Sequence, residues 1–218
     1  MPGRASASGV GSDVDADIIM AMNDVRVCFV GDSFVAGVGD SEYLGWAGRL
    51  AAGTARAGLT AYNLGVRRQT SSEIRDRWLG ECTPRLPSGC EGRVVFSFGV
   101  NDTTVENGSV RVDPARSVEN LAAVLKECAE TGWRALVVGP PPIADVGQNE
   151  RTARLDRSFA DICLGAGVPY VAVFAELSGN AVWAEEVRNG DGAHPDSGGY
   201  RELAELTRPA WDTWIADS

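Results

Sequence analysis

Residues 25–33 read VRVCFVGDS and decide the fold class. Residues 25–30 are apolar apart from Arg26, and an apolar run of this length is typical of a parallel strand that is buried on both faces. The run stops at Gly31, Asp32 and Ser33, three residue types that favour turns. The stretch therefore predicts a buried strand with a serine just beyond its carboxyl end.

Four further runs of the same character follow along the chain and predict the other strands: Thr60–Leu64, Val94–Phe98, Ala135–Val138 and Val168–Phe174. Helical patterns separate them, over Trp46–Ala57, Ser72–Leu79, a long helix opening at Asp113-Pro114, Glu150–Leu164 and Gly199–Ile215. Repeated strand–helix units imply right-handed crossovers, so the pattern predicts an α/β fold, a three-layer α/β/α sandwich around a parallel sheet.

The segment of residues 1–24 is rich in Gly, Ser, Ala and Asp and predicts a flexible N-terminal tail. Beyond it we find neither a linker nor an internal repeat. We therefore expect residues 25–218 to form a single domain.

The chain has 218 residues and a formal net charge of −10. An acidic protein without a basic run is a poor partner for nucleic acid or an anionic membrane surface, and no apolar stretch approaches the ~20 residues that span a bilayer. His194 is the one histidine, which excludes multi-histidine metal sites, and we expect neither metal nor cofactor. The five cysteines show no CxxC spacing, which favours reduced thiols and a cytoplasmic location, although Cys82 and Cys90 could bridge a loop.

Polar residues and glycines follow the predicted strands where each strand ends. Ser33 follows the first strand, Gly65 the second and Asn101 the third, while Asp191 and His194 share a late loop. Ligands of open parallel sheets bind at the carboxyl ends of the strands. An acid three residues before a histidine can hold the imidazole toward a nucleophile. Each block alone is compatible with an ordinary turn, but the chain combines them in the order serine, glycine, asparagine, then acid and histidine.

In these four blocks the chain resembles the SGNH hydrolases, the GDSL lipase/esterase family. The matching residues are Gly31-Asp32-Ser33, Gly65, Gly99-Val100-Asn101-Asp102 and Asp191-Gly192-Ala193-His194. The resemblance covers roughly residues 25–215. It implies a flavodoxin-like, five-stranded parallel sheet of order 2-1-3-4-5 and a carboxylic ester hydrolase acting on small acyl esters.

Carried over residue by residue, the resemblance implies that Ser33 is the nucleophile, His194 the base and Asp191 its orienting acid. It also implies an oxyanion hole formed by the backbone N–H groups of Ser33 and Gly65 and by the side-chain amide of Asn101. A thioesterase or acyltransferase would use the same acyl-serine. A non-catalytic, flavodoxin-like binding module is the alternative from another class, but the chain has neither the three-glycine nor the Walker phosphate-binding pattern.

Residues that could contact substrate are less sharply marked by the sequence. Phe34 directly follows the serine, Pro141 lies in a triple-proline rim after the fourth strand, and Trp183 is a large residue near a predicted loop. Arg67 and Arg68 are either outward-facing charges or a site for an anionic part of the substrate. The chain offers no large insertion that could act as a lid, so we expect an open cleft for short or soluble esters.

Overall fold

The computed structural model describes residues 24–217, so the predicted tail lies outside the described residues except for Asp24. Five parallel strands form the central sheet: β1 (Val25–Gly31), β2 (Leu59–Gly65), β3 (Glu91–Ser97), β6 (Arg134–Val138) and β7 (Tyr170–Val171). Their order is β2-β1-β3-β6-β7. Counted among the sheet strands alone this is 2-1-3-4-5, which confirms the predicted topology.

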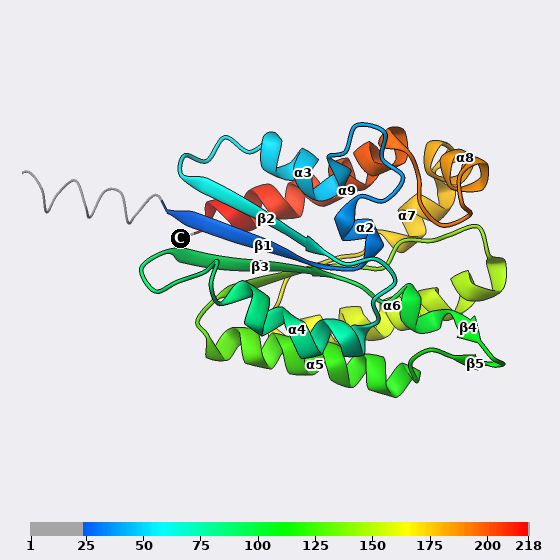
Figure 1. Cartoon of the computed structure of the whole chain (residues 1–218), viewed down its shortest axis with the longest axis horizontal. Helices are drawn as coiled ribbons and strands as arrows, with labels where there is room; N and C mark the ends of the chain where they lie inside the picture. The colour runs from blue at the N-terminus through cyan, green and yellow to red at the C-terminus, as the bar shows by residue number, and fades with distance from the viewer. Residues whose placement is uncertain (1–23, 218) are drawn as a thin grey trace, which may run out of the picture.

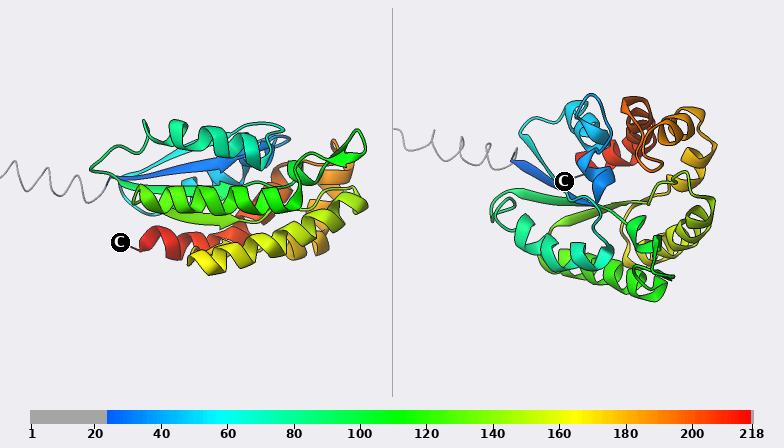
Figure 2. Two further views of the ribbon diagram at one scale, coloured as in Figure 1. Left: turned by 90° about the horizontal axis from the view of Figure 1, so that it is seen from below. Right: turned by 45° about the vertical axis from the view of Figure 1, so that its right-hand side comes forward.

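Helices cover both faces of the sheet, which confirms the three layers (Figure 1, Figure 2). One face carries α4 (Ser71–Cys82), α5 (Pro114–Glu130) and α6 (Val146–Ala166). The other carries α3 (Gly45–Ala52), α7 (Phe174–Gly179), α8 (Ala181–Asn189) and α9 (Ser197–Ala216).

Successive side chains of β1 point into two hydrophobic cores, one on each face of the sheet. Val27 and Phe29 face α3 and α9, whereas Cys28 and Val30 face α4 and α5. Phe29 packs edge-on to Trp46, with 5.7 Å between ring centroids, and stacks on Trp211 at 5.4 Å. Burying an aromatic side chain of this size contributes roughly 1.5–3 kcal/mol, so this strand anchors the layer that holds the C-terminal helix.

Helix starts follow their capping residues. Glu73 accepts a hydrogen bond from the N–H of Thr70 at 2.8 Å, closing a capping box on α4. Asp113 accepts from the N–H of Ala115 at 2.9 Å, and Pro114 occupies the first turn of α5. These contacts explain why the two helices begin where the sequence predicts.

Three details of the prediction are wrong. The fifth strand is only two residues long, because Val173 and Leu177 are buried through the start of α7 instead of continuing the strand. Strand β2 lies at the sheet edge and is largely exposed, so it is not buried on both faces. The helices α7 and α8 and the hairpin of β4 (Val105–Glu106) and β5 (Ser109–Val110) were not expected.

All five cysteines lie in the described part of the chain and are free thiols, so no bridge joins Cys82 to Cys90. Between residues 24 and 217 no helix combines the length and the apolar character that crossing a bilayer requires.

Candidate active site

The first candidate residue lies where β1 turns into the short helix α2 (Ser33–Ala36). Gly31 at the end of β1 is in register with Gly65 of β2 and Ser97 of β3, so three strand ends meet here. Asp32 caps α2, accepting a hydrogen bond from the N–H of Phe34 at 3.0 Å. Ser33 is therefore the first residue of a helix and is held in a fixed position above the sheet edge.

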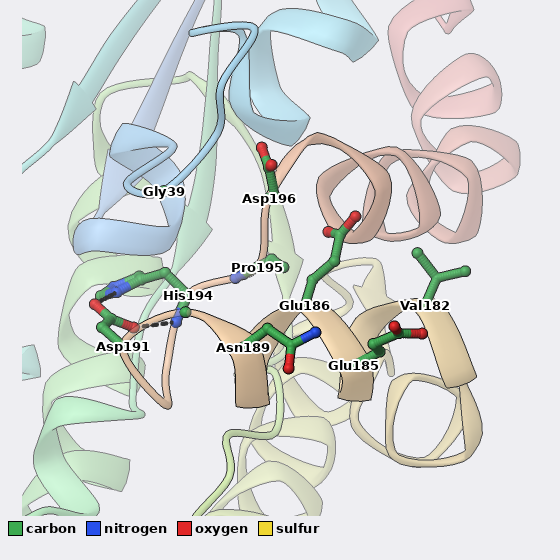
Figure 3. A pocket seen from close by; sticks show the side chains of 10 residues that line it. Gly39, Val182, Glu185, Glu186, Asn189, Asp191, His194, Pro195 and Asp196 are labelled. Atoms are coloured by element: carbon green, nitrogen blue, oxygen red, sulfur yellow. Dashed lines mark hydrogen bonds and ion pairs between the residues drawn. The ribbon is translucent and has the colours of Figure 1, made fainter.

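The acid and the histidine come from the loop between α8 and α9 (Figure 3). The ring Nδ1 of His194 lies 2.7 Å from Oδ2 of Asp191, and the other oxygen accepts the N–H groups of Ala193 at 2.9 Å and of His194 at 2.8 Å. On the far side of the ring, Nε2 lies 2.7 Å from Oγ of Ser33. The structure thus joins all three residues in one hydrogen-bonded chain.

The charges along this row of hydrogen-bonded side chains suit proton transfer. Burial alone would raise the pKa of Asp191, but hydrogen bonds from the backbone and ring of His194 and from the N–H of Ala193 outweigh it and hold this pKa at about 2. Asp191 is therefore ionised at neutral pH and favours the tautomer with a proton on Nδ1. In that tautomer Nε2 is an acceptor placed to take the hydroxyl proton of Ser33.

The three predicted oxyanion donors differ in how they are used. The N–H of Ser33 lies in the first turn of α2, where it has no partner within the helix. The N–H of Gly65 donates to Oδ1 of Asn63 at 3.0 Å. The amide Nδ2 of Asn101 donates to the carbonyl of Gln69 at 3.0 Å and to Oδ2 of Asp32 at 3.2 Å. All three lie near the strand ends, but two of them already have acceptors.

Two buried carboxyls support this region. Burial raises the pKa of Asp32 to about 7; the hydrogen bond from Phe34 opposes the rise and the charge of Asp102 adds to it. Burial also raises the pKa of Asp102, whose Oδ1 accepts from the N–H of Ser71 at 2.7 Å. Asp102 thereby ties the start of α4 to the 3-10 turn Asn101–Thr103.

A cleft of about 220 Å³ contains Ser33 and His194. Phe34, Arg67 and Arg68 line it, as three of the five predicted substrate residues. The remaining lining residues are Val100, Asn101, Thr104, Glu106, Arg111, Ile143, Gln148 and Ala193.

The other two predicted substrate residues lie elsewhere. Pro141 is buried and is not among the residues of this cleft. Trp183 is only 2% exposed, donates from Nε1 to the carbonyl of Pro142 at 3.0 Å and stacks behind Phe34 at 6.3 Å. Phe34 in turn packs against the His194 ring at 4.9 Å, so Trp183 supports the cleft from the core.

A larger groove of about 660 Å³ is also lined by His194, together with Asp191 (Figure 3). Glu185 and Glu186 on α8 and Asp196 before α9 also line it. The two hollows that share His194 therefore differ in charge: three arginines and one glutamate line the Ser33 cleft, whereas four carboxylates line the groove.

Sequence reasoning missed several residues that shape the site. The carbonyl of Gln69 and the side chain of Asn63 accept hydrogen bonds from two of the candidate donors. No local pattern marks Gln69, whereas an asparagine two residues before Gly65 is a known signal for a side-chain bond to the backbone N–H. Glu106 lies on the β4–β5 hairpin. The Asn107-Gly108 dipeptide, a strong two-residue hairpin signal, would have revealed that hairpin.

Comparison with known proteins gives the family of the chain and relatives of its fold. The sequence profile of the GDSL-like Lipase/Acylhydrolase family matches residues 29–202, and a search of curated proteins gives no match. Among solved structures, a lipase/acylhydrolase from Enterococcus faecalis is similar to the chain at 20% identity and a TM-score of 0.69, covering 87% of this chain and 96% of that one.

Two further structures give comparable matches. A putative GDSL-like lipase from Parabacteroides merdae has 19% identity and a TM-score of 0.72, covering 88% of this chain and 97% of that one. The acetylxylan esterase Axe2 from Geobacillus stearothermophilus has 16% identity and a TM-score of 0.66, covering 86% and 94%. At these identities the structural matches establish the fold, whereas the profile covers most of the chain and includes Ser33, Asn101 and His194. The chain therefore belongs to the GDSL-like lipase/acylhydrolase family and is a carboxylic ester hydrolase.

Proposed function

We propose that the protein hydrolyses small acyl esters through an acyl-enzyme on Ser33, with His194 as general base and Asp191 as its orienting acid. The observation that carries the proposal is the hydrogen-bonded chain in which Nε2 of His194 meets Oγ of Ser33 at 2.7 Å and Nδ1 meets Asp191 at 2.7 Å.

In the first half-reaction Oγ of Ser33 attacks the ester carbonyl carbon while its proton passes to Nε2 of His194. The tetrahedral intermediate collapses, the carbon–oxygen bond to the alcohol breaks, and His194 returns the proton to the leaving alkoxide. Water then attacks the acyl-serine with His194 again as base, which releases the carboxylic acid and restores Ser33. The charge of Asp191 stabilises the imidazolium that forms in both halves.

The oxyanion of the intermediate would be held by the N–H groups of Ser33 and Gly65 and by the amide of Asn101. The Asn101 amide contacts Asp32 at 3.2 Å and Gln69 at 3.0 Å. The longer of these contacts is the one the oxyanion would replace, while the bond to Gln69 keeps the amide oriented. A substrate carbonyl therefore competes with Asp32 for the Asn101 amide, and with Oδ1 of Asn63 for the N–H of Gly65.

The size of the cleft argues for short acyl groups. Its volume is about 220 Å³, against about 660 Å³ for the groove that shares His194, and buried Phe34 closes one wall. A long acyl chain would extend beyond this space into solvent.

The experiment combines active-site labelling with a chain-length series. A fluorophosphonate probe should add one label to the full-length protein, located on Ser33 by peptide mass, and the Ser33→Ala variant should not react. The His194→Ala variant should label at least 100-fold more slowly, whereas Ser158→Ala, a serine on α6 outside the cleft, should label normally. Undiminished labelling of His194→Ala would refute the assigned base.

With 4-nitrophenyl esters, kcat/KM should be greatest for two to six acyl carbons and fall beyond eight. Acyl-coenzyme A thioesters and added alcohol acceptors in the same assay separate hydrolysis from thioester cleavage and acyl transfer. A kcat/KM that rises steadily to twelve carbons would contradict the assignment to small esters.

We also propose a reducing, cytoplasmic setting for the protein. The support is that its five cysteines, all within the described residues, are free thiols. Fractionation of cells that express the tagged chain tests this.

A further inference from the structure

Arg67 lies in a turn that is fixed on both sides. The N–H of Val66 donates to the carbonyl of Gly31 at 3.0 Å, and the N–H of Gln69 closes the turn on the carbonyl of Val66 at 3.4 Å. The carbonyl of Gln69 also accepts from Asn101. The turn is thus joined to the end of β1 and to a candidate oxyanion donor, and it presents Arg67 from a rigid support.

The neighbouring cations are already neutralised. Arg68 pairs with Glu106 at 3.0 Å. Arg111 lies 3.7 Å from both Glu73 and Glu106, and its Nη1 donates to the carbonyl of Arg68 at 2.8 Å. All three arginines line the Ser33 cleft, and Arg67 is exposed like Arg68. Arg67 differs from the other two in one respect: within residues 24–217 its guanidinium has neither an ion pair nor a side-chain hydrogen bond.

The groove that shares His194 with the Ser33 cleft has the opposite charge to Arg67. Its acidic residues are Asp191, Glu185, Glu186 and Asp196, and the chain as a whole has a net charge of −10. An anionic group would be repelled from that groove and attracted to the Arg67 side.

Resting on the proposed function, we infer that Arg67 is a specificity residue that binds an anionic group of the substrate, so the preferred substrates are short esters bearing a carboxylate or a phosphate. A guanidinium can bind either group with two parallel hydrogen bonds. A hydrogen bond to a charged group changes a binding equilibrium by about tenfold or more, which sets the expected preference.

The test compares substrates that differ in charge and little in shape. Monoethyl glutarate and ethyl valerate place the charge in the acyl part, and 4-acetoxybenzoate and phenyl acetate place it in the alcohol part. The Arg67→Gln variant should lower the anionic-to-neutral ratio of kcat/KM about tenfold in one of the two pairs, and that pair identifies the part of the substrate that Arg67 binds. Arg67→Lys should retain part of the preference, and 1 M salt should weaken it.

A matched control removes the same charge at a distance. Lys126 on α5 has a side chain that is 74% exposed and does not line the Ser33 cleft. The helix runs on from there to Glu130 and then to the start of β6, at the end of the strands opposite to Ser33. The Lys126→Ala variant should keep the wild-type ratio in both pairs. If Arg67→Gln leaves both ratios within twofold of wild type, or if Lys126→Ala lowers them equally, the inference is overturned.

A binding measurement keeps this result separate from the catalytic proposal. In the Ser33→Ala variant, NMR titration should show monoethyl glutarate or 4-acetoxybenzoate binding at least fivefold more tightly than its neutral counterpart, and adding Arg67→Gln should abolish the difference. Equal binding within both pairs would overturn the role of Arg67. A failure of fluorophosphonate to label Ser33 would overturn the proposed function instead, and the titration would still decide the role of Arg67.

Discussion

Replacing Gly65 by alanine should damage catalysis through the backbone. A Cβ built on Gly65 lies 2.2 Å from the N of Ala36, 2.7 Å from its Cα and 2.8 Å from the carbonyl oxygen of Asp32. Real Cβ contacts stay above 3.0 Å, so α2 and the end of β2 must separate by at least 0.8 Å, the difference between 3.0 and 2.2 Å. Because α2 begins at Ser33, the shift moves the nucleophile relative to His194.

A misplacement of about 1 Å at a reacting group costs on the order of 10²-fold in rate, and overpacking costs about 1–3 kcal/mol of stability. We therefore expect Gly65→Ala to lower kcat/KM for 4-nitrophenyl acetate about 100-fold, measured at a temperature where circular dichroism shows the variant folded. Urea unfolding measures the loss of stability.

Gly80→Ala is the matched control. Gly80 lies within α4 and a Cβ there meets nothing within 4 Å, so alanine should leave activity unchanged and stabilise the helix by up to ~1 kcal/mol. If folded Gly65→Ala retains kcat/KM within threefold of wild type, the close approach of α2 to β2 does not position Ser33 and the reasoning is refuted.

Three further predictions concern the site and its surroundings. Asn101→Ala should lower kcat about 10²–10³-fold, and Ser33→Ala should lower it further; equal losses in the two variants would argue against a separate oxyanion role. Burial alone would raise the pKa of Asp40, but hydrogen bonds from Arg49 and from backbone N–H groups lower it from 3.8 to about 2, so its ionised form should stabilise the fold by about 2 kcal/mol above pH 4. That contribution is lost as the pH falls through 2, so urea unfolding of wild type and Asp40→Asn should differ at pH 6 and converge near pH 2. Trp183→Phe should cost about 1 kcal/mol of stability, because the bond from its Nε1 to Pro142 is lost, while a large change in acyl-chain preference would show that Trp183 contacts substrate directly.

The strands and the order of the site blocks could be predicted because their signals are local. The apolar run of β1 and the turn residues after it are contiguous, and the spacing of three between Asp191 and His194 lets both lie in one loop. The sheet order, by contrast, rested on the family resemblance, since strand pairing is a property of distant segments.

What failed depended on tertiary contacts. Trp183 was predicted from its size to line the cleft, but its indole N–H finds an acceptor in the core and the ring is buried there. The contact between the carbonyl of Gln69 and the amide of Asn101, 32 residues further along the chain, likewise has no local signal. Arg67 and Arg68 are adjacent and chemically identical, and the acid on a hairpin about 40 residues further along the chain distinguishes them.

The hydrogen bonds of Asp191 are all local, so the site forms from two separate parts of the chain: the loop with Asp191 and His194, and the segment with Ser33. One short loop supplies the carboxylate, the two N–H groups it binds and the ring it orients, so this half needs only local chain geometry. The contact between His194 and Ser33 joins residues 161 positions apart and requires the C-terminal helix to dock on the sheet. Loss of enzymatic activity should therefore indicate that the C-terminal helix has left the sheet. The loop that carries Asp191 and His194 could be exchanged between related proteins as one unit.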